Sequence, residues 1–256
     1  MKRVLAVTLG AALGVAIMLG ILQPWKRTPR APVPAPAPPV PMDRFDSARD
    51  LIEKDRIEEA RALLEDELRA DAWSARAVAL LALADLRGAN PLAAQSRLAQ
   101  ASAINPDLFE IPFVQGHIDM VRKEFRAANR SYTEAIRRRP RDARARGGRA
   151  AARFELKEYA GAVEDATAAL ASESSDADSL FTRAAAYGAL NRFEESVRDW
   201  TTYLAKRPKD AHAWTNRGNA NERMGQKAAA IADWRQAMTV DPTLTQQLEP
   251  LINGSQ

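Results

Sequence analysis

A fixed period of 34 residues restricts this chain more than any other feature of its sequence. Four prolines lie on that period, with gaps of 34, 68 and 34 residues: Pro106, Pro140, Pro208 and Pro242. Between them the apolar residues recur at spacings of three and four, and the short breaks contain Pro, Gly or Asn, which predicts helices joined by turns. Self-similarity at such a period is the signature of a repeat architecture. We therefore expect an all-α chain of stacked helix hairpins after Met42.

Cutting the chain every 34 residues gives six copies in register, which begin at residues 41, 75, 109, 143, 177 and 211. The eighth position is always small: Ala48, Ala82, Gly116, Ala150, Ala184 and Gly218. The twentieth position is small as well: Ala60, Ala94, Ala128, Ala162, Ser196 and Ala230. The twenty-fourth position is mostly large and apolar: Leu64, Leu98, Tyr132, Ala166, Trp200 and Trp234. We expect the small residues to let the two helices of a hairpin approach closely, and the large ones to fill the space between hairpins.

This pattern resembles the tetratricopeptide repeat (TPR) family, whose repeat has a large apolar residue, a Gly or Ala, an aromatic, an Ala, an aromatic, an Ala and a Pro. The last copy carries Trp214, Gly218, Ala230, Trp234, Ala237 and Pro242. The resemblance covers residues 43–244 and implies a right-handed superhelix, or α-solenoid, of about six TPR helix hairpins. The first helix of each hairpin would line a concave groove, at about residues 43–54, 75–88, 109–122, 143–156, 177–190 and 211–224. Residues 245–256 are expected to form a C-terminal cap and tail.

An uncharged run of 19 residues from Val4 to Leu22 precedes the repeats. As a helix it would span roughly 28 Å, which is close to the thickness of a bilayer core. Lys2 and Arg3 precede the run, and an interfacial tryptophan and two cations follow it. Residues 1–27 are therefore expected to form an N-terminal transmembrane helix, with a signal sequence as the alternative. Gly10 and Gly14 form a GxxxG spacing, which is compatible with a weak homodimer.

Residues 28–42 are rich in proline and are expected to form an extended spacer of roughly 40 Å between the anchor and the repeats. The short basic N-terminus favours a single-pass protein of the bacterial inner membrane with a periplasmic repeat domain, and a cytosolic orientation stays open. Residues 1–42 hold five basic side chains and no acid, so the remainder carries 37 − 5 = 32 basic and 33 acidic ones. This balance argues against nucleic-acid binding by the repeats.

Nine side chains are candidates for a protein-binding groove, because the resemblance places their positions on the inner side of the first helices. They are Phe113, His117, Met120, Arg144, Phe154, Phe181, His212, Asn216 and Asn219. This mixture of aromatic and amide groups suits an extended or helical peptide. The clamp with which some TPR proteins hold a C-terminal carboxylate is not met, because Gly148 and Thr182 stand at two of its positions.

No catalytic or cofactor motif is legible. The chain has no cysteine and two histidines, and it contains no Walker loop, HExxH or GxSxG. We therefore expect no enzyme activity, no cofactor and no metal. The acidic residues on the second helices, among them Asp165, Asp199 and Asp233, are expected to form solvated faces or pairs within one helix.

Eight arginines lie between Arg137 and Arg153, with only Asp142 to balance them. The register assigns the first three to the last turn of a helix, where cations complement the helix dipole. Pro140 ends that helix, and Asp142 is placed to cap the next one. Arg149 shares its position with Arg183 and Arg217 and so belongs to the repeat pattern. What remains is a local positive patch, for which an acidic protein partner is one interpretation.

The leading hypothesis is a membrane-tethered TPR scaffold that mediates protein–protein interactions in the bacterial cell envelope. The alternative is an accessory protein of exopolysaccharide or cell-wall assembly or of secretion machinery, which would bind glycan or the enzymes that make it. A third hypothesis, a regulator of an enzyme, requires the repeats to lie in the cytosol.

Overall fold

The computed structural model describes residues 43–172 and 176–254. The expected transmembrane helix, its GxxxG spacing and the proline-rich spacer lie outside these residues. Within them, no helix has both the length and the apolar character needed to cross a membrane.

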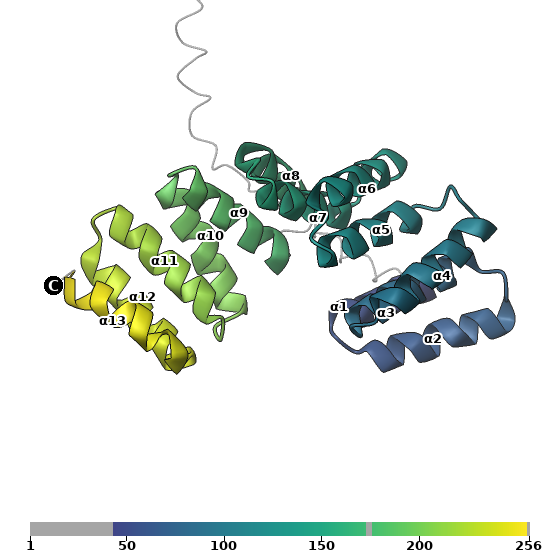
Figure 1. The fold of residues 1–256 in the computed structure, drawn as a ribbon, viewed down its shortest axis with the longest axis horizontal. Helices are drawn as coiled ribbons and strands as arrows, with labels where there is room; N and C mark the ends of the chain where they lie inside the picture. The colour runs from purple at the N-terminus through teal and green to yellow at the C-terminus, as the bar shows by residue number, and fades with distance from the viewer. Residues whose placement is uncertain (1–42, 173–175, 255–256) are drawn as a thin grey trace, which may run out of the picture. The chain divides into compact units, whose positions relative to one another are not determined.

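Within the described residues, twelve helices pair into six hairpins, and a final short helix follows them (Figure 1). The first helices are α1 (Arg44–Glu53), α3 (Ala75–Arg87), α5 (Glu110–Val121), α7 (Ala143–Glu155), α9 (Ala177–Ala189) and α11 (Ala211–Arg223). The second helices are α2 (Ile57–Ala70), α4 (Pro91–Ile104), α6 (Phe125–Arg138), α8 (Tyr159–Ser172), α10 (Phe193–Lys206) and α12 (Lys227–Val240). A 3-10 turn, η1 (Pro242–Leu244), leads into α13 (Thr245–Gly254). The described part is therefore an all-α repeat solenoid, as the period predicts.

Acidic caps start several of the first helices. Asp142 accepts hydrogen bonds from the backbone N–H groups of Arg144 and Ala145 at 3.1 and 3.2 Å, which confirms its predicted place at the start of α7. Asp176 and Asp210, each 34 residues further on, cap α9 and α11 in the same way.

Two residues after each first helix comes a residue with positive φ, again at intervals of 34: Asp55, Ala89, Lys123, Lys157, Asn191 and Gly225. The backbone N–H of the residue after it donates a hydrogen bond to the carbonyl five residues earlier, as from Glu158 to Arg153 at 2.9 Å. This is the Schellman ending, which favours glycine at the left-handed residue. Among these six positions, only Gly225 is a glycine.

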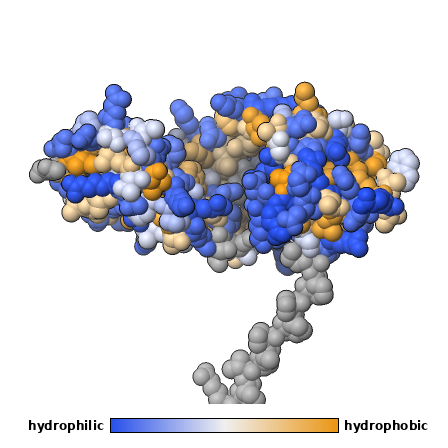
Figure 2. Space-filling model, turned by 90° about the horizontal axis from the view of Figure 1, so that it is seen from below, coloured by the Kyte–Doolittle hydropathy of each residue, from blue (hydrophilic) through white to orange (hydrophobic). Residues whose placement is uncertain are grey.

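The small and large positions pack as the register predicts. The alanines at the eighth and twentieth positions are fully buried, and Tyr132 and Trp234 are 1% and 2% exposed. A Cβ atom added to Gly116 would lie 2.7 Å from Tyr132, and one added to Gly218 would lie 2.7 Å from Trp234. At these two hairpins the large ring of the second helix therefore occupies the space that the missing side chain leaves. On the face that Figure 2 presents, hydrophilic residues dominate and smaller hydrophobic patches lie among them.

Consecutive first helices pack on one another, from α1 on α3 to α9 on α11, whereas no two second helices do so among the described residues. Each second helix from α2 to α10 instead packs between its own first helix and the next one, and α12 packs between α11 and α13. The first helices therefore form a continuous surface, which we call the inner face.

A repeated ion pair corrects one expectation. Asp165, Asp199 and Asp233 do not form solvated faces, because they are only 4%, 8% and 5% exposed. Each accepts two hydrogen bonds of 2.6–2.9 Å from an arginine on the first helix of its own copy: Arg149, Arg183 and Arg217. Each arginine also donates to a threonine of the preceding copy at 3.1–3.3 Å: Thr133, Thr167 and Thr201. We call this three-residue unit the arginine clamp. The pairing joins two helices, so the spacing within one helix could not reveal it.

Candidate functional site

A pocket of about 420 Å³ opens on the inner face where copies four, five and six meet. It is lined by α7, α9, α10 and α11. Four of the nine predicted groove residues converge there: Phe154, Phe181, Asn216 and Asn219. The pocket is thus the place where the structure brings sequence-predicted side chains together.

Aromatic rings form the apolar part of the pocket. Phe181 meets the edge of Trp200, with 4.9 Å between ring centroids, and lies 5.5 Å from Tyr203. Trp200 is 1% exposed, so it supports the pocket from below. Ala184, Ala185 and Gly188 of α9 line the same space and keep it open because their side chains are small.

Three polar side chains border these rings on α11. Asn216 makes no hydrogen bond within the described part of the chain. Asn219 accepts one at 3.0 Å from the indole N–H of Trp234 through its side-chain oxygen, which leaves its amide N–H groups available. Arg223 lies over the ring of Phe193 at 5.1 Å and forms no ion pair with any described residue. Apolar walls with a few convergent polar groups are typical of ligand sites.

This combination can bind an extended peptide. The rings would hold an apolar side chain, the two amides would bond to the peptide backbone, and Arg223 would attract a carboxylate.

Three predicted residues lie away from the pocket, with Phe113 in the core and His117 and Met120 half-buried. Phe113 is 3% exposed and meets the edges of His117 and Tyr132, with centroids 4.8 and 6.3 Å away. Met120 packs against the same cluster. Burial, together with the nearby charges of Arg87 and Arg144, lowers the pKa of His117 to about 4. His117 is therefore neutral at pH 7 and contributes to packing.

Two further predicted residues lie apart from the pocket. His212 is exposed near the start of α11. Arg144 lies on the inner face, but its guanidinium already bonds to Asp142 at 2.6 Å and pairs with Glu53 at 3.9 Å. The guanidinium also lies 5.7 Å from the ring centre of Phe113.

The rest of the arginine-rich stretch is largely occupied as well. Arg137 bonds to Glu134, and Arg146 donates to the carbonyl of Pro140 at 2.8 Å. Arg149 and Arg153 both bond to Asp165. Most arginines of this stretch are therefore already bonded within the protein.

Among the pocket residues that sequence reasoning missed, three have large side chains: Phe193, Trp200 and Arg223. Arg223 stands at a groove position of its copy, so the register alone could have found it. Phe193 and Trp200 belong to a second helix, and nothing in the period indicates that α10 reaches the inner face here. No cluster of potential metal ligands is found among the described residues.

Comparisons with known proteins support the repeat assignment. A sequence model described as tetratricopeptide repeat matches residues 113–178 and 181–240. No curated protein sequence matches the chain.

Solved structures with the same architecture share little sequence. A chain of the APC/C hetero-tetramer Cut9–Hcn1 has a TM-score of 0.69 at 14% identity, over 83% of this chain and 42% of that one. PilF of Pseudomonas aeruginosa has a TM-score of 0.66 at 16% identity, over 81% of this chain and 95% of that one. YrrB, a TPR protein with an unusual peptide-binding site, has a TM-score of 0.58 at 13% identity, over 73% and 97%. This chain thus spans less than half the length of the Cut9–Hcn1 chain. At such identities the likeness shows the fold alone, a helical-repeat solenoid of the TPR type.

Proposed function

We propose that this solenoid of the tetratricopeptide repeat type is a membrane-tethered scaffold, which holds a segment of a protein partner against the inner face of copies four to six. The observation that carries the proposal is the pocket, where four predicted groove residues meet. Its unbonded Asn216 and unpaired Arg223 are polar groups that the described chain leaves for a ligand. The fold suits protein–protein interaction, and the peptide-binding site named for YrrB supports a peptide as the ligand.

A protein partner is favoured over a glycan by the aromatic side chains of the pocket. A sugar ring stacks on an exposed aromatic face, but Trp200, the tryptophan that lines the pocket, is 1% exposed, and the exposed Trp73 lies outside it. The pocket offers amides and a cation beside phenylalanine rings, which suits a peptide better.

The proposed membrane tether is inferred from the sequence. The uncharged run at residues 4–22 and the proline-rich residues 28–42 support a single-pass anchor and a spacer. We place the anchor in the bacterial inner membrane and the repeats in the periplasm, with the Gly10 and Gly14 spacing as the contact for a weak homodimer. Alkaline phosphatase fused to the C-terminus is expected to be active. Fluorescence from a C-terminal fusion to a protein that fluoresces only in the cytosol would contradict this orientation.

The partner site is tested by crosslinking in cells. A photoreactive amino acid at Phe154 or Asn219 of the full chain is expected to form an adduct with a protein partner, because both side chains line the pocket. The same amino acid at Glu164, which is exposed on α8, is the matched control. The Arg223→Glu variant is expected to reduce the adduct, because it reverses the charge that attracts the partner.

Adducts at Glu164 with none at the two pocket positions would contradict the proposed site.

A further inference from the structure

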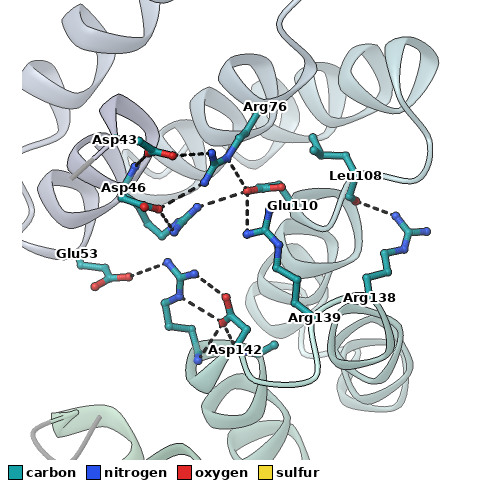
Figure 3. Close-up of polar contacts among 12 residues, drawn as sticks. Asp43, Asp46, Glu53, Arg76, Leu108, Glu110, Arg138, Arg139 and Asp142 are labelled. Atoms are coloured by element: carbon teal, nitrogen blue, oxygen red, sulfur yellow. Dashed lines mark hydrogen bonds and ion pairs between the residues drawn. The ribbon is translucent and has the colours of Figure 1, made fainter. Parts of the chain in front are cut away.

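A network of nine charged side chains lies on the inner face of the first four copies (Figure 3). It consists of Asp43, Asp46, Arg49, Glu53, Arg76, Glu110, Arg139, Asp142 and Arg144. We call these residues the inner-face ion network. Neither the repeat pattern nor the proposed partner site accounts for them.

Glu110 is the centre of the network. Its side chain is fully buried, and three guanidinium groups approach the same oxygen, Oε1. Arg76 lies 3.0 Å away, Arg49 lies 3.3 Å away and Arg139 lies 3.5 Å away. The other oxygen, Oε2, is buried without a hydrogen-bond partner. A single carboxylate is therefore shared by arginines from three different copies.

Two contacts of the network pass over neighbouring copies. Arg49 and Glu110 join α1 to α5, and Glu53 and Arg144 join α1 to α7. In a solenoid each repeat ordinarily contacts only its neighbours. The backbone of α1 packs on α2 and α3, and on no other described helix. Charged side chains rather than close helix packing therefore connect α1 to α5 and α7.

The same arginines cover phenylalanines. Arg76 lies over the ring of Phe45 at 4.6 Å, and Arg139 lies over the ring of Phe109 at 4.4 Å. Together with Arg144 above Phe113, they place a charged layer over the aromatic side chains of the inner face. A partner could reach those rings only if the arginines moved.

The positive and negative charges of the network nearly balance, and we expect the loss of the Glu110 charge to disturb it most. It contains five carboxylates and four guanidinium groups. Burial and the charge of Arg144 lower the pKa of Arg49, while Glu110 and Asp46 oppose this effect. Without the charge of Glu110, the buried Arg49 would face three other cations with less compensation.

We propose that the inner-face ion network is a latch, which closes the inner face of copies one to four on itself and leaves only the pocket of copies four to six open to a partner. The latch releases α1 from α5 and α7 when its charges are screened or when Glu110 is neutralised. Screening can act because Asp43, Asp46, Glu53 and Arg139 have side chains that are 41–50% exposed.

The distance between α1 and α7 tests the latch. The chain has no cysteine, so spin labels attach only to cysteines introduced at Lys54 and Glu155, which are exposed at the ends of these helices. Pulsed electron resonance on the full-length chain in detergent then measures their separation. We expect the distance to lengthen between 0.1 and 1 M salt, because the Debye length falls from about 10 Å to about 3 Å.

Two substitutions separate the latch from a general effect of salt. Glu110→Gln keeps the shape of the side chain and removes its charge, and it is expected to lengthen the distance already at low salt. Glu53→Gln changes a half-exposed side chain that cannot disrupt the core, and it is expected to produce a smaller shift in the same direction. Glu195→Gln is the matched control, because it breaks an exposed pair with Arg192 inside copy five, and it should leave the distance unchanged.

An unchanged distance at high salt and in Glu53→Gln would overturn the latch. These two measurements decide the question even if circular dichroism shows that Glu110→Gln no longer folds. A shift of the same size in Glu195→Gln would also overturn it, because the lengthening would then not depend on the network.

Discussion

At the scale of single residues, the turn inside each hairpin shows where the sequence departs from what its backbone prefers. Lys157 adopts a φ of 64°, a left-handed conformation in which its Cβ atom is crowded. Glycine adopts this conformation freely but loses more entropy on folding. The same position holds Lys123 and Ala89 in other copies, so several turns carry this cost.

We expect Lys157→Gly to stabilise the protein by about 0.5–1 kcal/mol, since the relief of crowding exceeds the added entropy cost. Urea denaturation followed by circular dichroism measures the change. Lys209→Gly is the control, because Lys209 is exposed in a turn and does not have a positive φ, and it should be neutral or slightly destabilising. A loss of stability in Lys157→Gly would show that the crowding at this turn is not costly.

At the scale of helices, the arginine clamp joins the hairpins of the second half of the chain. Arg183 bonds to Asp199 at 2.6 and 2.8 Å within copy five, and to Thr167 of copy four at 3.3 Å. The hydrogen bonds and charge of Asp199 outweigh the burial of Arg183 and raise the pKa of the guanidinium. The arginine therefore stays charged and fixes α9 against both α10 and α8.

We expect Asp199→Asn to destabilise the protein by about 2 kcal/mol, because it leaves a partly buried guanidinium without its carboxylate. Arg183→Met in the same background should recover part of the loss, since it removes the unpaired charge. Thermal unfolding of the two single variants and the double variant gives the coupling between them. Strictly additive effects would mean that the pair acts as two independent surface charges.

At the scale of the whole repeat domain, stability is a sum over neighbouring copies, and the ends have one neighbour fewer. The helix α13 covers the last hairpin, where Leu248 and Ile252 pack against Trp234 and Ala237. Leu248 is fully buried although it belongs to no repeat.

We expect Leu248→Ala to cost about 2–3 kcal/mol, since it opens a cavity beside Trp234. The loss should be local, so that hydrogen exchange quickens in α11 and α12 and stays unchanged in α3 and α4. Leu251→Ala, at a side chain that is 43% exposed on the same helix, is the matched control. Equal quickening in all copies would show that the domain unfolds as one unit.

The period was enough to predict the repeat fold, because it fixes which residues share a position. The helices of the structure begin within two residues of the registers predicted for the first helices, and the small and large positions pack as expected. Of the candidate site, Phe154, Phe181, Asn216 and Asn219 were predicted and meet in one pocket, whereas Phe113 lies in the core.

The period could not predict the contacts that depend on the rotation between one copy and the next. Arg49 and Glu110 lie 61 residues apart and in different positions of their copies. Their meeting depends on the curvature of copies one to three, and no rule of spacing states that curvature. Asp165, Asp199 and Asp233 were misjudged for a related reason, since their partners lie on the facing helix.

The arginine clamp also bears on how a chain like this one gains or loses length. Copies three, four and five each offer a threonine to the next copy, and copies four, five and six each offer an arginine to the one before, so these three joints are alike. A duplicate of residues 177–210 inserted after residue 210 would find the matching half of the joint on both sides. The first two copies take no part in this joint, because their charged side chains bond to particular partners. We therefore expect insertion of a whole copy to be tolerated where the arginine clamp repeats and not among the first copies.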